Sequence, residues 1–327
     1  MNPKRVSILG AGSFGTALAQ TVANNIDEVY LLGRDPDIID GINKHHENPR
    51  YFPGLTLAGN IRAAELGRTG IIAGSEFVIF AVPSGVTREI AREYGEALDG
   101  KTVLSTAKGI EAETLNTMSE IIVEESRAGY VASLSGPTFA DELIRGYLSV
   151  ATLGADDDSR RDILAGLLRR DSFILDYSPD IRGVELAGVL KNTYAIALGV
   201  FDSAYSSNNG HYAFLNLCYK ELCRILAAAS GDHDIAAKYC AFGDYNLTAN
   251  VDKSRNRTLG LMIGKNFLKS ARVNSGIVFE GLKAIRCLRD LSHRYHLESP
   301  IIEFVNQVLE DNSRVISLLD GLLKKIR

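Results

Sequence analysis

Two lysines and a Ser-Arg-Asn run are the side chains in this sequence that suit chemistry on a reacting oxygen or a phosphate. Lys191 lies in the stretch from Glu185 to Ala197, which is apolar and rich in small residues. Lysine is rarely buried, and loss of water disfavours its charged form, which suits proton transfer near neutral pH. The alternative is a lysine whose ammonium reaches solvent along an apolar surface, and this stretch favours the two equally.

Lys108 and the run that begins at Ser254 are the other candidates. Lys108 follows the apolar run 102–105, and the carboxyl end of such a strand faces the ligand crevice of a doubly wound sheet. The run from Ser254 to Thr258 reads SRNRT, which is typical of a helix start that binds an anion. Ser254 can cap the helix, and Arg255 offers planar donors to a phosphate. A solvated loop lysine and a capped helix with solvated arginines are alternatives of equal weight.

A glycine-rich turn near the start of the chain predicts a dinucleotide site. Gly10, Gly12 and Gly15 form the G-x-G-x-x-G pattern between a short apolar run and a helix-like stretch. The first glycine allows a tight turn, the second lets the backbone approach a pyrophosphate, and the third lets helix and strand pack closely. The helix start then offers free N–H groups to the phosphates. The alternative, a merely structural glycine turn, fits this position less well.

The end of the next predicted strand, 28–32, should contact the ribose that carries the adenine. An Asp or Glu there would favour NAD. Here the strand is followed by Gly33, Arg34 and Asp35, which places an arginine where a 2′-phosphate would lie. We therefore expect NADP(H) to be slightly preferred, with NAD(H) tolerated. The alternative is that Arg34 is a solvated loop charge.

Strand-like and helix-like segments alternate through the first half of the chain. This alternation predicts an α/β fold with a Rossmann-type, doubly wound and mostly parallel sheet. We expect strands at 6–9, 28–32, 76–82, 102–105, 130–134, 149–153 and 173–175, and helices at 16–24 and from about 113.

The pattern changes near residue 180. From Gly183 onward, long apolar-periodic stretches predict an all-helical domain, with helices at 185–204, 214–230, 279–296 and 301–326. The loop from Ser178 to Asp180 is the expected boundary. The expected domains are therefore residues 1–180, which bind NAD(P), and residues 181–327, which bind the substrate.

The composition excludes several classes of protein. The 327 residues are 46% hydrophobic and 23% charged, as in a globular protein of about two domains. The net charge of −4 gives no sign of a nucleic-acid partner. The four cysteines form no C-x-x-C pair and are expected to be free or buried thiols, and the six histidines lack zinc spacing, so we expect no metal.

The sequence also indicates where the protein works. It opens with no leader-like apolar segment, and no apolar run reaches the ~20 residues that span a bilayer. We therefore expect a cytoplasmic protein without a membrane span.

Taken together, the motifs resemble those of NAD(P)-dependent glycerol-3-phosphate dehydrogenase over nearly the whole chain. The matching stretches are residues 10–19, 46–54, 81–84, 108–109, 135–140, 190–192, 243–244, 254–257 and 280–281. Ser-Gly-Pro-Thr-Phe-Ala and Ser-Arg-Asn-Arg are highly specific in combination. The resemblance implies reversible reduction of dihydroxyacetone phosphate to sn-glycerol 3-phosphate, which feeds glycerophospholipid synthesis. It also implies a helical C-terminal domain like that of 6-phosphogluconate dehydrogenase, and a homodimer.

The resemblance further implies a role for each matching residue. The residues implied to line the cofactor are Gly10, Gly12, Ser13, Phe14, Gly15, Arg34, Lys108, Ala140, Arg255, Val278 and Glu280. Those implied to bind the substrate are Lys108, Gly136, Thr138, Lys191, Asn192, Asp244, Thr248, Ser254, Arg255 and Asn256. The implied catalytic residues are Lys191 as proton donor or acceptor, Asp244 as its assistant, and Lys108.

One region departs from the family pattern. Relatives commonly carry two arginines in the helix after the catalytic lysine, and the stretch from Asn209 to Cys218 has neither. The stretch from Ala241 to Asn250 also differs, although it keeps Asp244. Two alternatives follow: a paralogue that reduces another phosphorylated keto compound, and a non-catalytic NAD(P)-binding protein. The retained lysines, aspartate and SRN run argue against the second.

Overall fold

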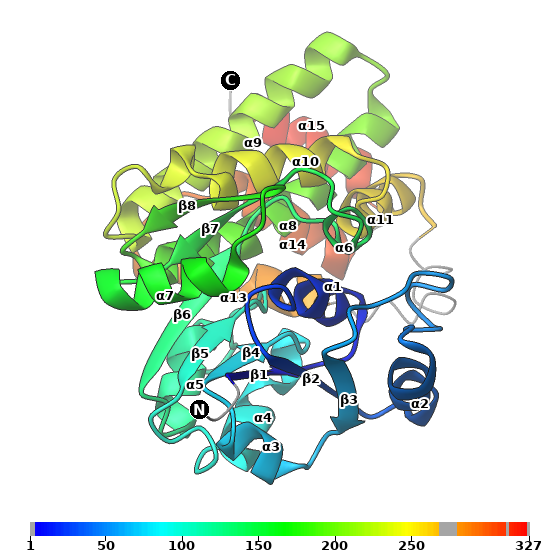
Figure 1. Cartoon of the computed structure of the whole chain (residues 1–327). Helices are drawn as coiled ribbons and strands as arrows, with labels where there is room; N and C mark the ends of the chain where they lie inside the picture. The colour runs from blue at the N-terminus through cyan, green and yellow to red at the C-terminus, as the bar shows by residue number, and fades with distance from the viewer. Residues whose placement is uncertain (1–3, 268–279, 312–313, 326–327) are drawn as a thin grey trace. The chain divides into compact units, whose positions relative to one another are not determined.

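A computed structural model describes residues 4–267, 280–311 and 314–325. The chain divides into two compact units (Figure 1). Unit 1 comprises Met1–Lys108 and Thr117–Glu185, and unit 2 comprises Gly109–Asn116 and Leu186–Arg327. Each unit has its own architecture and is described separately.

Unit 1 is built on an eight-stranded sheet in the order β3-β2-β1-β4-β5-β6-β7-β8. The strands are β1 (Arg5–Leu9), β2 (Glu28–Gly33), β3 (Ile61–Glu65), β4 (Phe77–Phe80), β5 (Thr102–Ser105), β6 (Tyr130–Ser135), β7 (Ser149–Gly154) and β8 (Phe173–Ser178). All neighbouring strands are parallel except the antiparallel pair β6 and β7. This confirms the expected doubly wound, mostly parallel sheet. The strand order reverses between β1 and β4, and ligands of such sheets bind at the carboxyl ends beside this point.

Helices cover both faces of the sheet because its strands are apolar on both sides. On one face lie α1 (Ser13–Val22), α2 (Pro36–His45), α6 (Ala140–Ile144) and α7 (Asp158–Leu168), and on the other lie α3 (Thr69–Ala73), α4 (Thr87–Glu93) and α5 (Met118–Glu125) (Figure 1). Alternate residues of a strand point to opposite faces. Accordingly, Val6 and Ile8 of β1 pack into the first layer, and Leu9 packs into the second.

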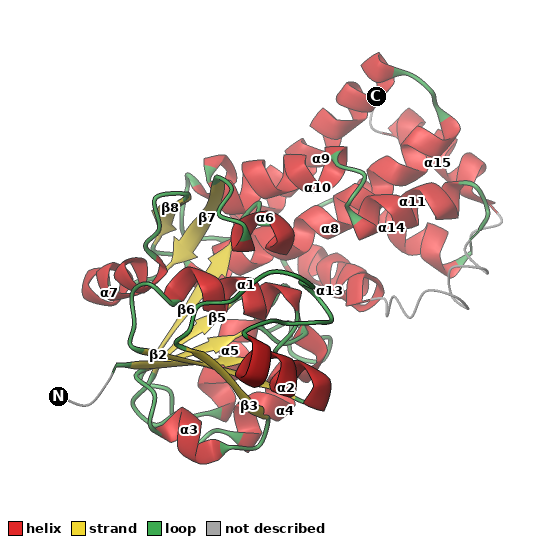
Figure 2. Cartoon of the chain, turned by 45° about the vertical axis from the view of Figure 1, so that its right-hand side comes forward, coloured by secondary structure: helices red, strands yellow, loops and turns green. Residues whose placement is uncertain are grey.

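Unit 2 contains helices and no strand among its described residues, as Figure 2 shows, which confirms the expected all-helical region. Its longer helices are α8 (Ile181–Ala204, in unit 2 from Leu186), α9 (Asn208–Ala229), α10 (Asp244–Asn250), α11 (Arg255–Gly264), α13 (Glu280–Arg294), α14 (Pro300–Glu310) and α15 (Val315–Lys325). Short helical turns lie at Ile235–Ala237 and Tyr239–Gly243.

Helix α8 is the one described helix that is long and apolar enough to cross a membrane. Its most apolar window is 94% buried inside the protein, which is the environment of a core helix. Two glycines allow α11 to cross α8 closely. A Cβ on Gly199 would lie 2.3 Å from the carbonyl oxygen of Arg257, and one on Gly260 would lie 2.2 Å from that of Ile196.

The structure differs from the expected elements at several points. Strand β3 was not expected because its sequence, IRAAE, is short and partly charged; as an edge strand it needs only one neighbour. The helix expected from about 113 begins at Met118, where Thr117 and Glu120 form a capping box. The helix expected at 301–326 is two helices, α14 and α15, and the polar residue Asp311 follows the first. Helix α10 was also not expected, whereas the SRN run predicted the start of α11.

Candidate active site

The glycine turn between β1 and α1 leaves room for a pyrophosphate. Gly10 has a φ of +115°, and a Cβ there would lie 2.5 Å from the carbonyl oxygen of Ala81. A Cβ on Gly15 would lie 1.9 Å from the carbonyl oxygen of Gly10. Gly12, which precedes the first turn of α1, differs because a Cβ there would meet no protein atom within 4 Å. Packing therefore requires glycine at positions 10 and 15, and the open space beside Gly12 fits an approaching phosphate.

A buried asparagine holds this turn in place. Asn48 is fully buried, and its Nδ2 donates to the carbonyl oxygen of Ala11 at 3.3 Å and to Thr16 Oγ1 at 2.9 Å. Thr16 Oγ1 in turn donates to the carbonyl oxygen of Gly12 at 2.8 Å. Asn48 had no role in the sequence-based site. The only signal for it was its place in the matching stretch 46–54, because a contact across 37 residues leaves no local pattern.

Arg34 and Asp35 directly follow β2 and make different contacts. Asp35 caps α2 by accepting from the backbone N–H of Asp37 at 3.1 Å, and it accepts from Arg50 Nη1 at 2.9 Å. The bond from Arg50 lowers the pKa of Asp35. Arg34 instead lines a hollow beside the ends of β2 and β3, together with Arg68. Asp35 is therefore paired with Arg50, while the hollow is bordered by two guanidinium groups, Arg34 and Arg68, and by the carboxylates of Asp40 and Glu65.

Four further residues of unit 1 lie after the carboxyl ends of β5 and β6. Lys108 Nζ donates to the carbonyl oxygen of Gly136 at 3.4 Å, and Thr138 Oγ1 donates to the same oxygen at 3.2 Å. Position 136 requires glycine, because a Cβ there would lie 2.5 Å from the Cα of Ala151. Ala140 begins α6 two residues beyond Thr138. The structure thus brings Lys108, Gly136 and Thr138 into direct contact.

Unit 2 contains a buried lysine with two partners. Lys191 and Asp244 are only 7% and 1% exposed. Lys191 Nζ donates to Asp244 Oδ1 and, at 2.9 Å, to Thr248 Oγ1. Helix α8 carries the lysine, and α10 carries both partners four residues apart, which places them on one helix face. The ammonium does not reach solvent along an apolar surface. The carboxylate stabilises its charged form against the cost of burial.

The SRN run begins α11 as expected for a capped helix. Ser254 is buried, and its side chain accepts from the backbone N–H of Arg257 at 3.3 Å. Asn256 Nδ2 donates to Asn192 Oδ1 at 2.8 Å, which joins this helix start to the residue after Lys191. Arg255 is exposed. The seven expected substrate residues of unit 2 therefore lie on α8, on α10 and at the start of α11: Lys191, Asn192, Asp244, Thr248, Ser254, Arg255 and Asn256.

Two expected cofactor residues are beyond what the structure describes in full. Val278 lies outside the described residues, and Glu280 is described only as the first residue of α13. Within the described ranges, no group of three or more His, Cys, Asp and Glu side chains could hold a metal ion.

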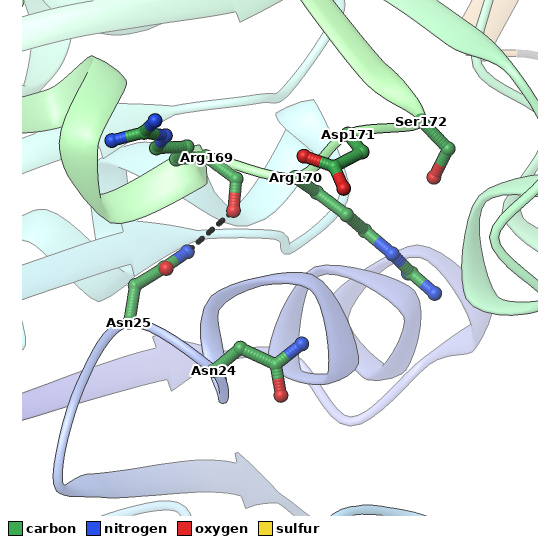
Figure 3. A pocket seen from close by; sticks show the side chains of 6 residues that line it. All are labelled: Asn24, Asn25, Arg169, Arg170, Asp171 and Ser172. Carbon is green, nitrogen blue, oxygen red and sulfur yellow. Dashed lines mark hydrogen bonds between the residues drawn. The ribbon is translucent and has the colours of Figure 1, made fainter.

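Unit 1 contains a further hollow beyond the carboxyl end of α1. It is lined by Asn24, Asn25 and residues 169–172 (Figure 3). Asn25 Nδ2 donates to the carbonyl oxygens of Arg169 at 2.7 Å and Leu167 at 3.0 Å. The asparagines follow the carboxyl end of α1, whereas the glycine turn precedes its amino end. None of the expected site residues lines this hollow.

The fold and these residues define a class: a dinucleotide-binding protein with a helical second unit that carries a buried lysine. Comparison with known proteins identifies the family. Residues 5–161 match the N-terminal part of NAD-dependent glycerol-3-phosphate dehydrogenase, and residues 180–320 match its C-terminal part. The chain therefore belongs to the NAD-dependent glycerol-3-phosphate dehydrogenase family and is an oxidoreductase, which confirms the resemblance.

Individual relatives cover nearly the full length. The chain is 43% identical over 310 residues to a glycerol-3-phosphate dehydrogenase [NAD(P)+] of Methanothermobacter thermautotrophicus, covering 95% of this chain and 94% of the relative. It is 34% identical over 327 residues to the protein of that name from Nitratidesulfovibrio vulgaris, covering 98% of each. The crystal structure of glycerol-3-phosphate dehydrogenase from Coxiella burnetii superposes with a TM-score of 0.88 at 26% identity, covering 98% of both chains.

Proposed function

We propose that this chain catalyses the reversible, NAD(P)H-dependent reduction of dihydroxyacetone phosphate to sn-glycerol 3-phosphate, and so supplies glycerophospholipid synthesis. One observation carries the proposal. A buried lysine that can give up a proton, Lys191, shares a helical unit with a helix start suited to phosphate, Ser254 to Asn256. A substrate with a carbonyl and a phosphate matches both features.

The chain's own residues protonate and hold the substrate. When bound, NAD(P)H would supply the hydride that reduces the carbonyl carbon. Lys191 donates a proton from Nζ to the carbonyl oxygen as negative charge develops there, and Lys108 stabilises the same charge. Asp244 and Thr248 hold Nζ in position through the two bonds described above. In the reverse direction Lys191 accepts the proton from the hydroxyl of glycerol 3-phosphate.

Phosphate binding fixes the reacting carbon. Arg255 and Asn256 donate to the phosphate, and Ser254 and Thr248 complete its surroundings. Binding energy from this remote group is used to orient the carbonyl. Asn192 contacts Asn256 directly, so it links phosphate binding to the helix of Lys191. On the side of the cofactor, Gly136 and Thr138 contact the substrate beside Lys108.

The cofactor is held by the glycine turn and by residues along the carboxyl edge of the sheet. We assign this role to Gly10, Gly12, Ser13, Phe14, Gly15, Arg34, Lys108, Ala140, Arg255, Val278 and Glu280. Arg34 and Arg68 at the hollow beside β2 support a preference for NADP(H), because a guanidinium there can donate to a 2′-phosphate. Residues 1–180 would bind NAD(P), and residues 181–327 the substrate, in a cytoplasmic homodimer.

The cofactor preference has a direct test. We expect Arg34→Ala to lower kcat/KM for NADPH by about tenfold or more, because a guanidinium–phosphate bond is charge-assisted. The value for NADH should change less than about threefold. Arg62→Ala, which removes an exposed arginine on β3, is the matched control. If the ratio of kcat/KM for NADPH to kcat/KM for NADH is unchanged in Arg34→Ala, the assignment of Arg34 is contradicted.

The activity is tested by following NADPH and NADH absorbance with dihydroxyacetone phosphate at pH 7–8. Rapid oxidation is the expected result. Oxidation with another phosphorylated keto compound but not with dihydroxyacetone phosphate would instead identify a paralogue of changed specificity. Binding of NADPH without turnover of any such compound would identify a non-catalytic NAD(P)-binding protein.

A further inference from the structure

The stretch that departs from the family pattern places a histidine in a charged cluster of unit 2. This Asp202 cluster consists of Asp202, His211, Asn250, Asp252 and Arg257. His211 Nδ1 lies 2.8 Å from Asp202 Oδ1, and Arg257 Nη2 donates to Asp202 Oδ2 at 3.0 Å. Arg257 Nη1 also donates to Asp252 Oδ1 at 2.8 Å. The side chains of Asp202, His211 and Arg257 are 13%, 15% and 17% exposed, so water screens their interactions only in part.

The His211 ring has a polar contact on each side. Opposite Asp202, Nε2 lies 2.9 Å from Asn250 Oδ1. The Asn250 amide has its orientation set by Nδ2, which donates to the carbonyl oxygen of Asn246 at 2.9 Å. The ring therefore bridges Asp202 and Asn250.

The charges of the cluster differ in their exposure. Asp202 and Arg257 are mostly buried and pair with each other, whereas the Asp252 side chain is 97% exposed. The Asp202 carboxylate is therefore the centre of the cluster: Oδ2 accepts from Arg257, and Oδ1 lies against His211 Nδ1.

The cluster joins the helices that carry the substrate residues. Asp202 lies on α8 eleven residues after Lys191, which is close to three helical turns and places both on one helix face. Asn250 ends α10, which carries Asp244 and Thr248. Arg257 directly follows Asn256 in the first turn of α11. His211 contributes the link from α9, through Asp202 to α8 and through Asn250 to α10.

We propose that His211 is a positioning residue for substrate phosphate: its ring holds Asp202 and Asn250, and Asp202 orients Arg257 and thereby the Ser254–Asn256 helix start. His211 does not contact the substrate. Its effect is on how well the phosphate is held, so it determines the preference for phosphorylated over unphosphorylated ketones. This inference rests on the proposed reduction of dihydroxyacetone phosphate.

The test compares two substrates that differ in the phosphate. We expect His211→Gln to lower kcat/KM for dihydroxyacetone phosphate about tenfold, through KM, with kcat within about twofold, as for one lost charge-assisted bond. For dihydroxyacetone, kcat/KM should change less than about twofold. His211→Arg, which offers donors in two directions, should recover most of the loss. His233→Gln removes an exposed histidine of the same unit and is the matched control.

Asp202→Asn extends the test to the carboxylate that contacts His211. It should raise KM for dihydroxyacetone phosphate similarly, and the double variant with His211→Gln should lose less than the product of the two effects, because the residues act as a pair. Arg257→Lys carries the same test independently if either variant fails to fold. It keeps the charge and loses the two-carboxylate geometry, so KM should again rise with kcat retained.

Three results would overturn the inference. They are an unchanged KM in folded His211→Gln, an equal loss with both substrates, and full additivity in the double variant. Each presupposes that the wild-type protein oxidises NADPH with dihydroxyacetone phosphate. If it does not, the proposed function fails first, so the two failures are distinguishable.

Discussion

At the scale of single residues, the proposed proton transfer depends on what holds the ammonium of Lys191. Burial disfavours the charge, and the contacts with Asp244 and Thr248 favour it. We expect Lys191→Ala to lower kcat about 10²–10⁴-fold, as for loss of a general acid. NADPH oxidation with dihydroxyacetone phosphate measures the loss. NADPH affinity, measured by fluorescence, should change far less, because the glycine turn is untouched.

Lys220→Ala is the matched control for this variant, since it removes an exposed lysine of the same unit. Lys191→Ala leaves Asp244 as a buried charge without its lysine, which costs stability. Lys191→Met fills more of the volume and should show the same loss of kcat. Near-normal turnover in either folded variant would contradict the assigned role.

Asn48 gives a second prediction at this scale. Because it holds the carbonyl of Ala11 and the hydroxyl of Thr16, Asn48→Ala should loosen the glycine turn. We expect the Kd for NADPH to rise about tenfold, which is about the cost of a buried polar group left without its partner. The kcat at saturating cofactor should stay within about threefold. Fluorescence titration with NADPH measures the change.

A matched asparagine separates this effect from general destabilisation. Asn60 Nδ2 likewise donates to two carbonyl oxygens, those of Ala23 and Ile26, at 2.8 and 2.9 Å. These lie beyond the carboxyl end of α1, away from the glycine turn. Asn60→Ala should therefore lower Tm without changing the Kd for NADPH. If both variants weaken NADPH binding equally, the role of Asn48 is not specific to the turn.

The sequence was most informative about site residues that form local patterns. The glycine turn and the SRN run are each read from adjacent residues, and both occur where a strand or helix start was expected. Asn48 and Asp202 could not be found in this way. Asn48 contacts Ala11, which is 37 residues away, and Asp202 contacts Arg257, which is 55 residues away. Long-range contacts of this kind leave no regular spacing in the sequence.

At the scale of helices and strands, Glu185 gives unit 1 a pH-dependent stability. Its buried carboxylate accepts from the backbone N–H and hydroxyl of Ser119 at 3.0 and 2.5 Å, at the start of α5. Burial raises its pKa from 4.5 to about 7, although the Ser119 bonds oppose the shift. The folded protein therefore keeps a proton that the unfolded chain releases. This contribution to stability is complete below pH 4.5 and is lost as the pH rises through about 7.

Glu185→Gln should remove this dependence, because glutamine resembles the protonated acid. From urea unfolding at pH 5 and pH 8, we expect the wild-type free energy of unfolding to fall by about 2 kcal/mol more than that of the variant. Glu96→Gln, at an exposed glutamate of the same unit, should behave as the wild type. Equal pH dependence in the wild type and Glu185→Gln would contradict the argument.

The crossing of α8 and α11 gives the second prediction for elements. An alanine at 260 would place its Cβ 2.2 Å from the carbonyl oxygen of Ile196, so the helices must separate. We expect Gly260→Ala to destabilise the protein by about 1–3 kcal/mol, as for overpacking. Gly321→Ala in α15 is the matched control, because that Cβ would meet nothing within 4 Å. Thermal unfolding should show a lower Tm for the first and an equal or higher Tm for the second.

Elements were predictable where hydrophobic periodicity was strong. The long buried helix α8 and the central strands of the sheet have continuous apolar runs, and their positions were close to those expected. Strand β3 and helix α10 are short, and their residues are partly polar. Their position is fixed by tertiary contacts, β3 through its pairing with β2 and α10 through the Lys191 contacts. Local sequence therefore underdetermines them.

At the scale of the whole molecule, the two units carry different parts of the proposed reaction. Unit 1 carries the glycine turn, Arg34 and Lys108, and unit 2 carries the Lys191 group and the SRN run. The family match extends over both, at residues 5–161 and 180–320. The proposed reduction draws on both units, and it requires that a hydride reach the carbon whose oxygen Lys191 protonates.

The most direct test of this hydride transfer follows the transferred hydrogen. The purified full-length protein is given dihydroxyacetone phosphate and NADPH deuterated at C4, in each of the two stereochemical forms. We expect the wild-type protein to form sn-glycerol 3-phosphate with deuterium at C2 from one form of NADPH only. Lys191→Ala should form almost no product in the same time. Product without deuterium from either form, or no product from a wild-type protein that binds NADPH, would contradict it.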